Sequence, residues 1–185
     1  MQACARTKLQ YDVPELDEAV ELVAYDDSWP DLYDRERFRI ALAFGVVPKS
    51  GLIQHIGSTA VPGLVSKPVI DLMIGSGAWP PPDALARGVC ALGYENLGDA
   101  GVPKRIYLRL RGPLKFNVHI VRRGGTHWTN NIALRDYLRE NAAARETYAA
   151  AKVAALNIGR GRLLAYSEAK SSVIGELIAA ARRQV

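Results

Sequence analysis

The stretch QHIGSTAVPGLVSKPVIDLMI, residues 54–74, places a Gly-Ser pair after one short apolar run and a single aspartate inside a second run. The second run, PVIDLMI, is apolar at both sets of alternating positions, which is typical of a central strand in a covered sheet. A carboxylate flanked by Ile70 and Leu72 is costly if it is buried without a partner. We therefore expect Asp71 to pair with a cation, bind a metal ion, or lie at a strand end facing solvent.

The patterns on either side of this stretch predict an α/β (α+β) fold. Residues 52–56 form a second short strand, and Ser28 before Pro30 marks the start of a helix over 26–45. The other patterns predict an edge strand over 20–25, a helix over 82–94, a hairpin of 105–111 and 114–121, and helices over about 127–140, 142–157 and 166–183. We expect a small mixed β-sheet with helices packed on it and a helical C-terminal part. Residues 1–19 are predicted to be a loosely held N-terminal extension, and 20–185 a single domain.

The composition is that of an ordinary globular chain. Of the 185 residues, 49% are hydrophobic and 23% are charged, which suffices for a sizeable core. The N-terminal residues lack the apolar core of a signal peptide, and no window reaches the roughly 18 apolar residues of a membrane span. We expect a cytoplasmic protein without membrane association, and the sequence does not indicate an oligomeric state.

The formal net charge of +5 is unevenly distributed. Residues 104–123 carry seven lysines and arginines and no acidic residue. This stretch is either a solvated strand pair or one wall of a groove that attracts a phosphorylated or acidic ligand. The pattern does not favour nucleic acid as a partner, because it matches no known nucleic-acid-binding motif.

The Gly57-Ser58 pair is suited to phosphate. A strand that ends in Gly-Ser-Thr presents backbone N–H groups and a hydroxyl with little obstruction, so Gly57, Ser58 and Thr59 are candidate ligand-binding residues. A carboxylate at Asp71 on the next strand could hold a divalent cation that bridges the same phosphates. Lys67 is either a further phosphate contact, a partner for Asp71, or an ordinary surface lysine.

Several separate motifs resemble one known family in their order along the chain. They are VELVAYDDSWPDLYDRER, HIGSTAVPGLVSKPVIDLMI, LGYE, FNVHIV, HWTNNIALRDYLREN, YAAAKVAAL and AYSEAK. Together they are similar to the GrpB-like family over about residues 20–183. That family is grouped with the nucleotidyltransferase fold superfamily and also occurs fused to dephospho-CoA kinases. The resemblance implies binding of a nucleoside triphosphate with a divalent metal, Mg²⁺ or Mn²⁺, and transfer of a nucleotidyl group to an unknown small acceptor.

The chain departs from the usual transferase pattern at the metal ligands. The place of a second carboxylate is taken by Met73, whose soft thioether is a poor ligand for Mg²⁺, and the later strand offers Asn117 and His119. One alternative is therefore a non-catalytic module that binds a nucleotide or a CoA-like ligand. Another is a transition-metal site formed by His55, Asp71 and His119.

Other side chains have both a functional and an ordinary interpretation. His119 is a satisfied strand histidine, a metal ligand, or the general base that takes a proton from an acceptor hydroxyl. Arg135 is a candidate anion contact. Tyr166 and Lys170 are four residues apart on one helix face. The resemblance implies a base-stacking role for the tyrosine and a phosphate contact for the lysine, although packing and solvation explain them equally. We expect Trp128 to anchor a helix against the sheet.

Overall fold

A computed structural model describes residues 16–44 and 51–184, and it contains a five-stranded mixed sheet. The strand order is β1-β2-β5-β4-β3, with β2 parallel to β5 and the other pairs antiparallel. The strands are β1 (Ile53–Ile56), β2 (Ile70–Ser76), β3 (Glu95–Asn96), β4 (Arg105–Leu110) and β5 (Phe116–Arg122). The predicted small mixed sheet is confirmed.

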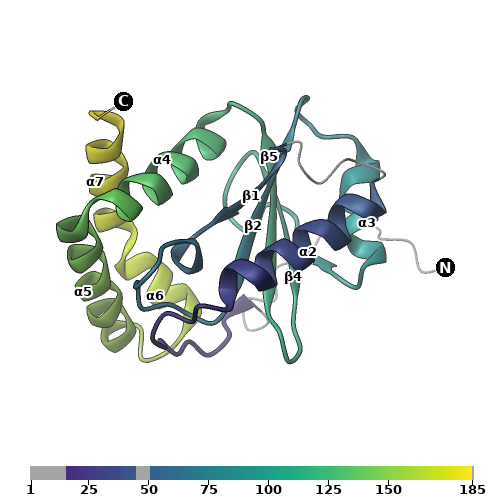
Figure 1. The fold of residues 1–185 in the computed structure, drawn as a ribbon. Helices are drawn as coiled ribbons and strands as arrows, with labels where there is room; N and C mark the ends of the chain where they lie inside the picture. Colours follow the sequence, from purple (N-terminus) through teal and green to yellow (C-terminus); the bar gives the residue numbers. More distant parts are fainter. Residues whose placement is uncertain (1–15, 45–50, 185) are drawn as a thin grey trace.

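Helices cover both faces of this sheet (Figure 1). The first face is covered by α2 (Trp29–Ala43) and α3 (Asp83–Ala91). The helical C-terminal part lies on the other side and consists of α4 (Thr126–Glu140), α5 (Ala142–Ile158), α6 (Leu163–Ala169) and α7 (Ser171–Arg182). Within the described residues, no helix combines the length and the apolar character that a membrane crossing requires.

Strand alternation separates the main core from the polar residues of β2 and β5. Leu72 and Val118 face α2 and α3 and pack in a cluster that includes Ile40 and Val89. Side chains at the intervening positions point to the opposite face. There the parallel register places Asp71 beside Asn117 and Met73 beside His119. The candidate site therefore lies on the face that the C-terminal helices cover.

Three elements differ from the sequence-based expectations. The predicted edge strand over 20–25 does not join the sheet. It makes one isolated bridge, from Val23 to Ser66, and a second bridge joins the preceding residue Ala19 to Arg162. The short strand β3 was not predicted, because two residues carry too little alternation to be recognised. The helix predicted over 166–183 is interrupted at Lys170 and forms α6 and α7. Its apolar spacing continues across the break, and no glycine or proline marks it.

The predicted N-terminal extension is held in place where the structure describes it. Asp17 forms an ion pair with Arg162 at 3.0 Å, and Glu18 forms one with Arg111 at 2.6 Å. Residues 1–15, most of the predicted extension, lie outside the described residues, as does Gly45 at the predicted end of the first helix. The described part of residues 1–19 is thus attached to the domain.

Candidate functional site

Two adjoining cavities of about 360 and 310 Å³ lie between the sheet and the C-terminal helices. They share the lining residues Gly57, Ser58, Asp71, His119, Tyr148 and Lys170. We call the first cavity the lysine lobe, because Lys67 and Lys152 line it in addition to Lys170. We call the second the asparagine lobe, because Asn130 and Asn131 line it. The cleft thus has two compartments that meet at Asp71.

Asp71 is held at the junction by polar neighbours on the same face. Its Oδ1 accepts a hydrogen bond from Asn117 Nδ2 at 2.7 Å and lies 3.3 Å from His119 Nε2. Burial raises its pKa, but the hydrogen bond and charge of His119, together with Lys67 and Asn117, outweigh this and lower the pKa of Asp71 to about 2. The side chains of Asp71 and His119 are 23% and 17% exposed, so a ligand in the cleft can reach both. Asp71 is therefore an ionised carboxylate at the wall of the cleft.

Asn117 is itself oriented by two donors. Its Oδ1 accepts hydrogen bonds from the Tyr107 hydroxyl at 2.8 Å and from Arg111 Nη2 at 3.1 Å, and Arg111 is paired with Glu18. With its oxygen occupied, the amide must present Nδ2 to Asp71. Arg111, from the basic stretch 104–123, thus orients the Asn117 amide that holds Asp71. Arg109 in the same stretch pairs with Glu95 at 2.8 Å.

The second carboxylate oxygen of Asp71 faces the Gly57 turn. A Cβ added to Gly57 would lie 2.6 Å from Asp71 Oδ2, and Gly57 has φ +72° and ψ −173°, a region that only glycine adopts readily. The turn continues as the 3₁₀ helix η1 (Ser58–Ala60). The N–H groups of Ser58 and Thr59 precede its first internal hydrogen bond, from Ala60 N to Gly57 O at 3.2 Å. Two backbone N–H groups that the 3₁₀ helix does not use therefore lie next to the carboxylate.

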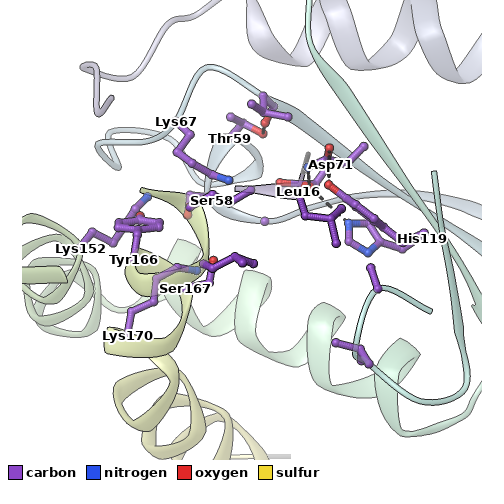
Figure 2. Close-up of a pocket in the computed structure, with 18 of the residues that line it drawn as sticks. Leu16, Ser58, Thr59, Lys67, Asp71, His119, Lys152, Tyr166, Ser167 and Lys170 are labelled. Carbon is purple, nitrogen blue, oxygen red and sulfur yellow. Dashed lines mark hydrogen bonds and ion pairs between the residues drawn. The ribbon is translucent and has the colours of Figure 1, made fainter. Parts of the chain in front are cut away.

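Three lysines surround this turn. Figure 2 shows Lys67 and Lys170 reaching toward Ser58 from different sides, with Lys152 behind Tyr166. Burial lowers the pKa of all three, and for Lys152 burial and the charges of Lys170 and Lys67 lower it to about 7. Lys152 is only 2% exposed and donates hydrogen bonds to the Val65 carbonyl and, at 3.3 Å, to Ser66 Oγ. This concentration of cations beside one carboxylate makes the lobe attractive to an anion with several negative charges.

Two lysines extend past tyrosines that lie four residues before them in the chain. Lys152 Nζ lies 5.3 Å from the ring centroid of Tyr148 on α5, and Lys170 Nζ lies 5.1 Å from that of Tyr166 on α6. Tyr166 is 1% exposed, so its ring packs in the core under the lysine and offers little surface for stacking a base. Sequence reasoning missed Tyr148 and Lys152, although they repeat the Tyr-x-x-x-Lys spacing of Tyr166 and Lys170. That repetition was the available signal.

The structure does not bring His55 together with Asp71 and His119. His55 pairs with Leu72 across β1 and β2, so its side chain points to the opposite face, where it stacks on Tyr33 at 4.6 Å between ring centroids. No cluster of three histidine, cysteine or acidic side chains suited to a metal occurs in the described ranges 16–44 and 51–184. A divalent cation at Asp71 would therefore take its other ligands from phosphate and water, as Mg²⁺ commonly does. The geometry does not fit a metal held by three protein side chains.

Met73 lies two residues after Asp71 on β2, so strand alternation places it on the same face of the sheet. It is fully buried in a cluster with Ile56 and Val121, and Trp128 and Ile132 of α4 pack over it. Trp128 thus anchors α4 against the sheet, as the sequence predicted. Because α4 covers this position, a carboxylate placed there would be buried in an apolar cluster.

Two predicted ligand-binding residues hold the turn from within the protein. Thr59 is 1% exposed, and its Oγ1 bonds to the Val69 carbonyl at 3.5 Å and lies 3.1 Å from His55 Nε2. Arg135 donates two hydrogen bonds to Asp136, one to Gln54 Oε1 and one to the His55 carbonyl. These contacts show that Arg135 holds the end of β1, and its role as an anion contact stays a prediction.

Comparison with known proteins places the chain in a family. The GrpB protein family matches residues 19–180. The chain is 31% identical over 134 residues to UPF0157 protein YqkA of Bacillus subtilis, covering 72% of this chain and 38% of that protein. It is 30% identical over 172 residues to UPF0157 protein BH1888 of Halalkalibacterium halodurans, covering 86% and 81%. The crystal structure of conserved protein GrpB from Enterococcus faecalis superimposes with a TM-score of 0.75 at 28% identity, covering 89% of this chain and 98% of that one. The chain belongs to the GrpB family.

Proposed function

We propose that this GrpB family protein binds a nucleoside triphosphate with a divalent cation and transfers its nucleotidyl group to a small acceptor. The observation that carries the proposal is the lysine lobe, in which Lys67, Lys152 and Lys170 surround the Gly57 turn beside ionised Asp71. Lys152 is buried and Lys67 and Lys170 are partly buried, and lysines in such places are costly unless an anion offsets their charge. A triphosphate carries several negative charges along its length, so it can contact several of these lysines at once.

The residues fit a single divalent cation bridging protein and phosphate. Asp71 Oδ2 receives no hydrogen bond from any residue in the described part of the chain, whereas Oδ1 is held by Asn117 and His119. A cation on Oδ2 would neutralise phosphate charge and bring phosphate oxygens to the N–H groups of Ser58 and Thr59. The lysines would supply the positive charge that a second metal ion provides in a two-metal site.

His119 is suited to accept the proton from the acceptor. Burial lowers the pKa of His119 despite the neighbouring carboxylate, so its imidazole is neutral near pH 7. With Nε2–H donated to Asp71, the other ring nitrogen can take the hydroxyl proton. The acceptor oxygen then bonds to the α-phosphorus, the bond from that phosphorus to the β-phosphate bridging oxygen breaks, and pyrophosphate leaves. Lysines stabilise the charge that develops on the phosphate oxygens.

The first test is thermal unfolding with tripolyphosphate and with each of the four nucleoside triphosphates, in Mg²⁺, Mn²⁺ or chelator. A ligand at about 100 times its Kd adds about 2.7 kcal/mol, which shifts the Tm of a chain of this size by about 5–10 °C. We expect a shift for at least one nucleotide that is larger with metal, loses its metal dependence in Asp71→Asn, and falls in Lys152→Met.

Lys115→Met is the matched control, because it removes an exposed lysine of the basic stretch that does not line the cleft. It should leave the shift unchanged. Equal losses in Lys152→Met and Lys115→Met would mean that only net charge matters. No shift with any of these phosphates in the wild type would contradict the proposal.

A second candidate is a binding module that holds a nucleotide or CoA-like ligand without turnover. Met73 favours it, because its burial under Trp128 leaves Asp71 as the only carboxylate on this part of β2. Release of pyrophosphate from a nucleoside triphosphate distinguishes the two functions. It can be measured without the unknown acceptor, because water slowly takes the acceptor's place in a transferase. Release that depends on His119 supports transfer, whereas tight binding without release, at any metal concentration, supports the module.

A further inference from the structure

The asparagine lobe has a chemical character that the phosphate site does not explain. It lies between α4 and α7, and five aliphatic side chains form most of its apolar wall: Ile56, Leu134, Leu138, Ile174 and Ile178. Its polar residues include His127, Asn130 and Asn131, which share one face of α4 with Leu134 and Leu138. A cavity of about 310 Å³ with this lining suits a small, partly apolar molecule.

The two asparagines present acceptors that lack donors. Asn131 Nδ2 donates to the His127 carbonyl at 2.7 Å, which fixes the amide and leaves Oδ1 without a partner among residues 16–44 and 51–184. Asn130 Oδ1 is shielded from water and also has no partner in the described part of the chain. Shielded acceptors are almost always satisfied in native proteins. Asn130 Oδ1 therefore calls for an O–H or N–H donor, and Asn131 Oδ1 is oriented so that it can accept one from a molecule bound in the lobe.

The charges around the lobe exclude strongly charged ligands. Asp71 is its only carboxylate in the described ranges, and that carboxylate is engaged by Asn117 and His119 at the junction. A polycation would therefore find no dedicated partners. The Arg135 guanidinium is paired with Asp136, and Lys170 belongs equally to the lysine lobe, so an anion would compete with the phosphate for the same cation.

We infer that the asparagine lobe binds an uncharged, partly apolar molecule that carries a hydroxyl group, and that this molecule is the acceptor. The identification as acceptor rests on the proposed function. It follows from position, because the lobe meets the lysine lobe at His119 and Asp71. A second hydroxyl or amide N–H of the same molecule donates to Asn130 or Asn131, while the reacting hydroxyl loses its proton to His119.

A matched series of fragments tests the ligand class on the ¹⁵N-labelled full chain without nucleotide. Cyclohexylmethanol has the apolar ring and one donor. Its methyl ether lacks the donor, and cyclohexanecarboxylate and cyclohexylmethylammonium add a negative or a positive charge. We expect cyclohexylmethanol to bind with a Kd on the order of 1–10 mM, as fragments of this size do. It should move the side-chain amide signals of Asn130 and Asn131, and the other three should bind at least about 5-fold more weakly.

The variants Asn131→Leu and Asn130→Leu should abolish the preference for the alcohol over the ether. Thr129→Val is the control, because Thr129 is an exposed α4 residue that does not line the lobe. Equal binding of all four fragments, tighter binding of the carboxylate, or shifts confined to the signals of Thr129 and its neighbours outside the lobe would overturn the inference. Retention of the alcohol preference in both leucine variants, with dispersed spectra, would do so as well. Tripolyphosphate binding is measured separately, so failure of the lobe and failure of the phosphate site are distinguishable.

Discussion

The two faces of the sheet are built from the same strands but have different physical roles. On the face toward α2 and α3, Leu72 and Val118 belong to a continuous apolar cluster. On the face toward the C-terminal helices, Asp71 and His119 lie between those positions and line a cleft with one buried and two partly buried lysines. Alternation along a strand makes this separation possible without any change of backbone.

The difference shows where stability and ligand affinity reside. The first face contributes free energy of folding through apolar burial. The second face contains buried and partly buried cations, a carboxylate and a strained glycine, which oppose folding unless a ligand offsets them. We therefore expect substitutions on the two faces to have separable effects.

The largest expected effect is on the apolar face. Leu72 is fully buried, so Leu72→Ala removes packed methyl groups and leaves a cavity, which should cost about 3–4 kcal/mol of unfolding free energy. Urea unfolding measures this cost. Tripolyphosphate affinity measured under folding conditions should change less than about 2-fold, because Leu72 points away from the cleft. A large loss of affinity in the folded variant would mean that the two faces are coupled.

The second effect concerns the Gly57 turn. Gly57→Ala combines left-handed backbone strain with a contact of 2.6 Å to Asp71 Oδ2, so we expect a loss of about 2–3 kcal/mol in stability and at least about 10-fold in tripolyphosphate affinity. Gly63 is the matched control: its φ is +77°, but nothing lies within 4 Å of an added Cβ. Gly63→Ala should cost about 1 kcal/mol and leave affinity unchanged. Equal effects at both glycines would show that strain alone matters.

The apolar face was more predictable from the sequence than the cleft. The run PVIDLMI and the alternation of 114–121 predicted two core strands, and both exist, because burial of one face imposes a period that a local pattern records. The approach of Asp71 to His119 depends on the parallel register of β2 and β5, which pairs Asp71 with Asn117. These two paired residues are 46 positions apart in the sequence. Sequence order alone does not specify that register.

The lysines and His55 illustrate what local patterns omit. Lys152 was missed because an α5 lysine in YAAAKVAAL looks like an ordinary polar position, and its burial arises only when α5 packs over the Val65 carbonyl. His55 was grouped with Asp71 and His119 because all three were expected at adjacent strand ends, but strand parity sends the side chains of His55 and Asp71 to opposite faces. The register of the antiparallel pair β1 and β2 decides whether His55 shares a face with Asp71. The sequence of the turn between these strands does not reveal that register.

The smallest expected effect is a pH dependence that belongs to the lysine lobe. In the folded protein the pKa of Lys152 is lowered to about 7 by burial and by Lys170 and Lys67, whose own pKa values are lowered in the same direction. In the unfolded chain a lysine keeps its proton to about pH 10. Between about pH 7 and 10 the unfolded state therefore binds more protons, and the free energy of unfolding rises with pH in that window.

We expect unfolding by urea to require about 1–2 kcal/mol more free energy at pH 9 than at pH 7, with an unchanged m-value. Lys152→Met should flatten this rise, whereas Lys115→Met should preserve it, because Lys115 is exposed. Tripolyphosphate favours the protonated lysines, so its affinity should fall as pH increases over the same window in which the unliganded protein gains stability. If stability and tripolyphosphate affinity rose together with pH, the lysines would not be the groups that bind the anion. Opposite slopes would identify the cations that destabilise the second face as the ones that hold the phosphates.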